Sequence, residues 1–169
     1  MLYSLSKSPT WLLFLVSILP ILMGDFGLKL WAVSIVIICV FFSLWLFVIA
    51  KHLLIKVSSV QMFNFRKFKR VLITAAIFTL LLSTNMAFMN DNGLFAKWAV
   101  VVLTIGQFAL LYCYIFILNF VAKSIATVEL QKTANFEQYA SYFFCLFFFP
   151  IGIWFLNPRI KALLRKASR

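Results

Sequence analysis

Acidic residues, histidine and cysteine are scarce in this chain of 169 residues. It contains four Asp and Glu, one histidine and three cysteines, none of them in a C-x-x-C pair. These residue types supply most metal ligands and most general acid–base pairs. The sequence also lacks a glycine-rich phosphate loop and the H-E-x-x-H and G-x-S-x-G motifs. We therefore expect a non-enzymatic protein with no cofactor, no metal site and no disulfide framework.

Apolar residues are abundant. Hydrophobic residues make up 64% of the chain and charged residues 12%, whereas soluble domains are about one quarter charged. Two long uncharged runs are 30–50 and 98–122. The first of these would extend about 31 Å as a helix, which matches the hydrocarbon core of a bilayer. Three further apolar runs cover 11–23, 71–89 and 141–156. This pattern predicts a single-domain, all-α integral membrane protein with four transmembrane helices and a shorter fifth segment.

Part of the sequence is repeated. Residues 23–33 return as 89–100, and each copy continues through an apolar run to an Ala-Lys pair. Such a repeat indicates duplication of one helical hairpin. We predict repeat units over 8–63, 64–134 and a truncated 135–169, which gives two tandem hairpins and part of a third.

Candidate N-cap residues precede three of the apolar runs. Ser8 precedes the first run, Asn64 the third and Asn135 the fifth, and both asparagines are followed by phenylalanine. Gln138 lies three residues after Asn135, which is the spacing of a capping box. New helices are therefore expected to begin at 64–65 and 135–136.

The basic residues indicate an orientation. With the N-terminus in the cytoplasm, the connections 51–70 and 123–140 and Lys7 put nine cations inside, against Lys29 and Lys97 outside. The positive-inside rule favours this arrangement. It also explains the +12 net charge without nucleic-acid binding.

The first and last runs are each open to two interpretations. Residues 11–23 contain Pro20 and form either a first span or the core of a signal peptide. Residues 141–156 are interrupted by Pro150-Ile151-Gly152. If this run re-enters and returns, the basic tail lies inside and the count becomes 14 cations to two; the repeat instead favours a full fifth crossing. The tail is expected to form an amphipathic helix on the membrane surface.

Few amide or acidic side chains lie in or beside the spans. Asn85, Gln107 and Asn119 are interpreted as hydrogen-bonding residues between helices, or alternatively as the lining of a pathway. Asp25 and Asp91 occupy equivalent outer turns, where they cap the following helices or together bind a cation. None of the runs carries a charged residue at its centre, which argues against proton-coupled transport.

The last third of the chain resembles a known group. Residues 148–155 read Phe-Phe-Pro-Ile-Gly-Ile-Trp-Phe and are followed by Pro158-Arg159. This stretch is similar to one in a group of small, uncharacterised bacterial polytopic membrane proteins, and the resemblance covers about 40 residues. It implies a location in the bacterial inner membrane and brings no activity with it.

The function we expect is that of a small subunit or scaffold within a larger inner-membrane complex. The alternative is a channel or a carrier of ions or small molecules that acts as a homo-oligomer. The basic connection and the tail are also expected to contact anionic lipid. Candidate residues for contact with a membrane-protein partner or lipid lie in the last segment: Phe148, Phe149, Pro150, Trp154, Arg159 and Arg165.

Overall fold

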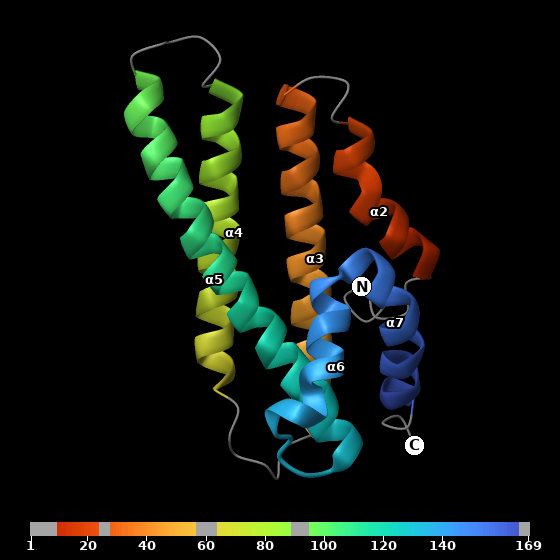
Figure 1. Ribbon diagram of the computed structural model, residues 1–169. Helices are drawn as coiled ribbons and strands as arrows, with labels where there is room; N and C mark the ends of the chain where they lie inside the picture. Colours follow the sequence, from red (N-terminus) through yellow and green to blue (C-terminus); the bar gives the residue numbers. More distant parts are fainter. Residues whose placement is uncertain (1–9, 24–27, 57–63, 89–94, 166–169) are drawn as a thin grey trace.

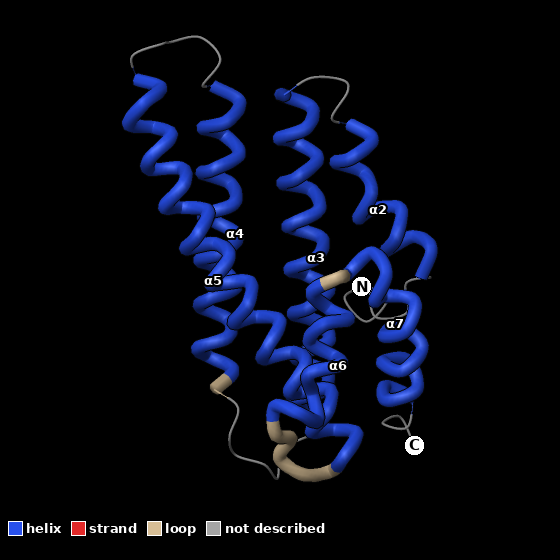
Figure 2. Tube along the Cα trace, in the orientation of Figure 1, coloured by secondary structure: helices blue, strands red, loops and turns tan. Residues whose placement is uncertain are grey.

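A computed structural model describes residues 10–23, 28–56, 64–88 and 95–165. Within these ranges the chain forms helices and no strands (Figures 1 and 2), so the predicted all-α class is confirmed. The helices are α2 (Thr10–Met23), α3 (Leu28–Lys56), α4 (Phe65–Phe88), α5 (Phe95–Leu130), α6 (Phe136–Phe147) and α7 (Phe149–Arg165).

Local capping accounts for the start of two helices and the end of one. The Lys67 backbone N–H donates to Asn64 Oδ1 at 3.1 Å at the start of α4. The Asn135 N–H donates to Gln138 Oε1 at 3.2 Å before α6. Both predicted helix starts are therefore confirmed. Helix α5 ends at Leu130, and the next residue, Gln131, has a left-handed φ of 54°, a common conformation just after a helix. Ser8, Asp25 and Asp91 lie outside the described residues.

The helices pair in the order of the chain. Each of the pairs α2–α3, α4–α5 and α6–α7 is antiparallel (Figure 1). Helix α3 packs against both α4 and α5, while α6 packs against α5 and α7 against α2. The third pair therefore packs against each of the first two pairs, α6 against α5 and α7 against α2. In Figure 1, α7 lies below the short helix α2, on the same side of α3.

The buried core lies in the half of the bundle that contains α6 and α7. Trp45 in α3, Phe68 in α4 and Ile117 in α5 are fully buried, and the rings of Phe68 and Phe120 stack with centroids 4.5 Å apart. The hairpin α6–α7 adds Leu146, Ile153, Leu156 and Ile160 to the same cluster. The second halves of α3 and α5 are therefore the best-packed parts of the long helices.

Large apolar side chains cover much of the surface. They repeat along one side of α3 at helical spacing and occupy several faces of α4 and α5; examples are Val33, Ile37, Val40, Ile73, Ile77, Leu81, Ile105 and Phe108. Soluble monomers rarely expose contiguous apolar surface on this scale. In the part of the chain described here, two stretches are long and apolar enough to cross a membrane, Val33–Leu53 and Thr104–Leu130.

The last segment differs from the prediction in two respects. The helix break lies at Phe148, whose ψ of 51° ends α6, because Pro150 falls in the first turn of α7, where its missing N–H costs no helical bond. The tail does not form a separate surface helix, since α7 runs through to Arg165. Ile160 is only 1% exposed because it lies on the same helical face as Ile153 and Leu156, which pack into the core.

Candidate functional site

The predicted pathway residues do not converge. Gln107 on α5 is exposed, and Asn119 on the same helix is half-buried. Twelve residues separate them, which places them about 120° apart around a helix of 3.6 residues per turn. Asn85 belongs to α4, but its side chain is outside the described set. The two described amides therefore do not line one path.

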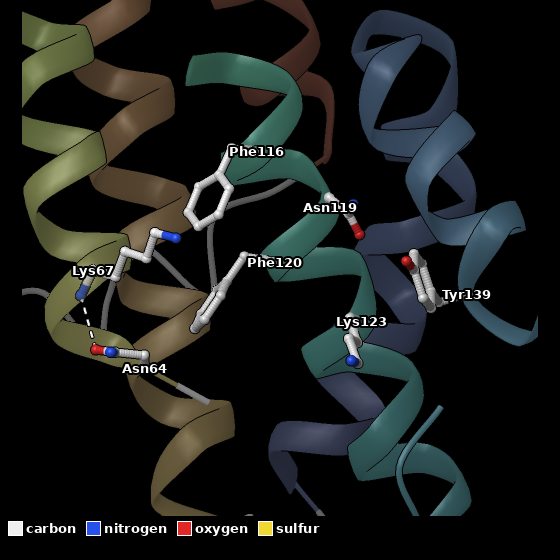
Figure 3. A pocket seen from close by; sticks show the side chains of 7 residues that line it. All are labelled: Asn64, Lys67, Phe116, Asn119, Phe120, Lys123 and Tyr139. Atoms are coloured by element: carbon white, nitrogen blue, oxygen red, sulfur yellow. Dashed lines mark hydrogen bonds between the residues drawn. The ribbon is translucent and has the colours of Figure 1, made fainter. Parts of the chain in front are cut away.

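A groove of about 310 Å³ lies where α4, α5 and α6 meet (Figure 3). Its residues come from the N-terminal end of α4, one face of α5 and the first turn of α6: Asn64, Lys67, Phe116, Asn119, Phe120, Lys123 and Tyr139. The four α5 residues share a helical face because their spacing follows i, i+3, i+4 and i+7. The sequence alone points to Asn119 as a pathway candidate and, through the basic connection 51–70, to Lys67 as a contact with anionic lipid.

The geometry of the groove depends on the cap of α4. Asn64 holds the first turn of α4 through its bond to the Lys67 N–H. The Lys67 ammonium then lies over the Phe116 ring, 5.5 Å from its centroid. In Figure 3, Asn119 and Tyr139 point toward each other from α5 and α6. Polar donors thus reach the groove from all three helices.

The groove is electropositive. Two of its seven lining residues are lysines and none is acidic. Arg66, Lys69 and Arg70 are exposed on the adjoining turns of α4. The N-terminus of this 24-residue helix adds the positive end of its dipole. An anion is therefore the class of ligand that this arrangement suits.

A second polar cluster connects α5, α6 and α7. The Tyr142 hydroxyl donates to Glu129 Oε2, and Arg159 Nη1 donates to the Tyr142 oxygen at 3.3 Å. The Arg159 guanidinium also lies 5.9 Å from the centroid of the Tyr142 ring. Arg159, predicted as a lipid or partner contact, therefore holds α7 to its neighbours. Arg165 ends α7, and its side chain is not described.

The turn between α6 and α7 is tightly packed on one side and exposed on the other. A Cβ atom at Gly152 would lie 1.8 Å from the Cys145 carbonyl oxygen, so the two helices approach each other as only glycine permits. Phe149 packs inward, with its ring 4.5 Å from that of Phe42 and 5.4 Å from that of Trp45. The exposed residues at this turn include Phe147, Phe148, Pro150, Ile151 and Trp154.

A polar cluster inside the bundle was not anticipated as a group. The Tyr114 hydroxyl of α5 lies near Cys39 and Ser43 of α3 and Thr79 of α4. Thr79 Oγ1 donates to the Ala75 carbonyl at 2.8 Å. Ser43 Oγ and Tyr114 Oη are buried without a hydrogen-bond partner in the described chain. The outermost members of this cluster, Cys39 and Tyr114, lie 75 positions apart in the sequence, so no local sequence pattern reveals the cluster.

Within the described ranges, no group of three or more His, Cys, Asp or Glu side chains could hold a metal ion. The three cysteines are free thiols, and all are half-buried. Comparisons with protein-family models, curated proteins and solved structures find no match for this chain.

Proposed function

We propose that this chain is a multi-pass protein of the bacterial inner membrane that acts as a non-enzymatic subunit or scaffold of a larger membrane complex. In this proposal helices α2 to α5 cross the bilayer as two tandem hairpins. The pair α6–α7 enters from the cytoplasmic side and returns to it. The N-terminus is cytoplasmic.

Contacts along α3 support the re-entrant path. Phe42 is the middle residue of α3 (Leu28–Lys56), and Trp45 lies one turn further. Because Phe149 packs against both, the α6–α7 turn reaches the midpoint of the stretch Val33–Leu53, which is long enough to span a membrane. Arg159 returns to the end of α5 through Tyr142 and Glu129. The two ends of the α6–α7 hairpin therefore lie toward the same end of the bundle, as a re-entrant path requires.

The distribution of charge supports the orientation. Cations of the described chain gather at the end of the bundle where α3 and α5 finish and α4 begins: Lys51, Arg66, Lys67, Lys69, Arg70, Lys123 and Lys132. On the re-entrant path, Arg159 and Lys161 of α7 join them. An excess of Lys and Arg marks the cytoplasmic side of bacterial membrane proteins.

The observation that carries the subunit role is the exposed aromatic turn at mid-membrane depth. Phe144, Phe147, Phe148 and Ile151 are all exposed there, Ile151 by 68%. Lipid can cover these side chains, and the Phe148, Ile151 and Gly152 N–H groups at the break are hydrogen-bonded within the turn. A helix break at this depth is nevertheless tolerated only where protein or a water-filled cavity covers it. A larger membrane protein that packs over the turn would supply this cover.

The test is photo-crosslinking in living cells from four positions of the full chain. A photoreactive residue replaces Phe148 or Ile151 at the turn. The matched controls are Ile77 on α4 and Ile105 on α5, which are also apolar and exposed. We expect a discrete adduct with a larger membrane protein from the turn and none from the controls. The same pattern from all four positions, or adducts only with a second copy of this chain, would contradict the subunit role.

A further inference from the structure

The groove between α4, α5 and α6 has features that the positive-inside rule alone does not require. Positive-inside charge needs only lysines and arginines near the membrane surface. Here Lys67 and Lys123 are accompanied by two amides and a tyrosine hydroxyl, all lining one space of about 310 Å³. That volume lies at the lower end of the range for ligand pockets.

We propose that this groove binds a phosphate group, either in the headgroup of an anionic phospholipid or as free phosphate. Phosphate oxygens accept several hydrogen bonds at once, and bonds from cationic donors are the strongest of these. The groove offers cationic donors on two different helices, Lys67 on α4 and Lys123 on α5.

Each remaining polar residue has a donor to contribute. The Asn64 side-chain oxygen already accepts the Lys67 backbone N–H, so the group that it offers a phosphate is its amide nitrogen. Asn119 contributes a second amide and Tyr139 a hydroxyl, which donates in the same way. Phe116 and Phe120 form an apolar wall, which suits the glycerol and first acyl carbons of a lipid.

The position of the groove also fits this ligand. It lies at the N-terminal end of α4, where the helix dipole favours an anion, and next to three further exposed cations of the same helix. On the proposed orientation this end faces the cytoplasmic leaflet, where headgroups of anionic lipids are available. The phosphate-binding chemistry itself depends neither on that orientation nor on a partner subunit.

The experiment is native mass spectrometry of the full-length protein in detergent. The protein is titrated with phosphatidylglycerol, with phosphatidylcholine and, separately, with inorganic phosphate as a competitor. The groove variant is Lys67→Gln with Lys123→Gln. The matched control is Lys69→Gln with Arg70→Gln, which removes the same charge from exposed positions on α4 outside the groove lining.

We expect one saturable phosphatidylglycerol site, weakened at least tenfold by the groove pair and less than about threefold by the control pair. Displacement of the lipid by inorganic phosphate would identify the phosphate itself as sufficient. Retention of the lipid would show that the glycerol and acyl carbons also contribute. Equal weakening by both pairs, or the absence of saturable binding of either probe, would overturn the proposal.

A second variant tests the groove without changing its charge, so that the proposal can still be tested if the charge variant does not fold. Asn119→Leu with Tyr139→Phe keeps the net charge and removes two hydrogen-bonding groups from the groove. We expect about fivefold weaker binding of phosphatidylglycerol, since each lost neutral hydrogen bond accounts for a factor of a few. Thermal unfolding of each variant in detergent shows whether it is folded, and unchanged binding by a folded variant of this second pair would overturn the role given to these side chains.

Discussion

The two halves of the bundle differ in what covers their apolar side chains. In the half that contains α6 and α7, the second parts of α3 and α5 are buried by protein, including Trp45, Ile49, Ile117 and Ile125. In the other half, α3 and α5 expose residues such as Val33, Val102 and Phe108. The α6–α7 hairpin thus covers the apolar side chains of one half, and lipid is expected to cover those of the other half.

This comparison has a consequence for stability. Apolar helices do not associate in lipid through the hydrophobic effect, so their contacts depend on packing, hydrogen bonds and close approach. Substitutions in the protein-covered half should therefore be costly, and similar substitutions in the open half should be nearly silent. Four predictions test this contrast, from the largest expected effect to the smallest.

Truncation of a core aromatic residue should have the largest effect. Phe68 is fully buried and stacks on Phe120, so Phe68→Ala should lower the free energy of unfolding by about 3–5 kcal/mol. Phe108→Ala, at a position 69% exposed, should change it by less than about 0.5 kcal/mol. Unfolding in detergent by denaturant or heat measures both. Similar losses from the two variants would remove the contrast between the halves.

Adding a methyl group at Gly152 should be the next most costly change. The new Cβ would meet the Cys145 carbonyl at 1.8 Å, and backbone cannot move aside without separating α6 from α7. We expect Gly152→Ala to cost about 3 kcal/mol. Gly106→Ala is the control, because its Cβ would meet only the flexible Leu82 side chain at 3.1 Å. Equal thermal stability of the two variants would mean that the hairpin is not held by this close approach.

Removal of the Tyr142 hydroxyl should weaken the attachment of the hairpin. Tyr142→Phe loses the bonds to Glu129 and Arg159 and should cost about 1.5–3 kcal/mol, the usual range when one partner is charged. Tyr112→Phe, at an exposed position on α5, should have no effect. The same unfolding measurement compares them, and a silent Tyr142→Phe would show that packing alone holds the hairpin.

Removal of the Tyr114 hydroxyl should have the smallest effect and the opposite sign. This hydroxyl is buried without a hydrogen-bond partner in the described chain, and a buried unsatisfied group is unfavourable. Tyr114→Phe should therefore raise the free energy of unfolding by up to about 1 kcal/mol. A clear loss of stability would instead indicate that a bound water or the neighbouring Ser43 and Thr79 satisfy the hydroxyl.

Local features of the fold could be predicted from the sequence. The starts of α4 and α6 follow from Asn64 and Asn135, because a cap acts over three residues and leaves a pattern of that length. The break in the last apolar run also followed from Pro150 and Gly152. Its position moved to Phe148 because proline fits the first turn of a helix better than its end.

The candidate site could not be predicted in the same way. Lys67, Lys123 and Tyr139 line one groove only because α5 packs between α4 and α6, and nothing in the 72 positions that separate the first from the last encodes that packing locally. For the same reason the sequence linked neither Arg159 to Tyr142 nor Tyr114 to Ser43. Among the groove residues, the sequence marks Asn119 as a pathway candidate, because an amide in an apolar run is conspicuous, and Asn64 only as a helix cap.

The re-entrant path of α6–α7 is tested most directly by cysteine labelling. In a chain freed of Cys39, Cys113 and Cys145, single cysteines replace Lys132, before α6, and Ala162, near the end of α7; both positions are exposed. A membrane-impermeant maleimide is applied to inverted and to right-side-out vesicles. Re-entrance predicts that both cysteines react in inverted vesicles and neither reacts in right-side-out vesicles. Reaction of the Ala162→Cys variant from the opposite side to Lys132→Cys would show a full crossing and contradict it.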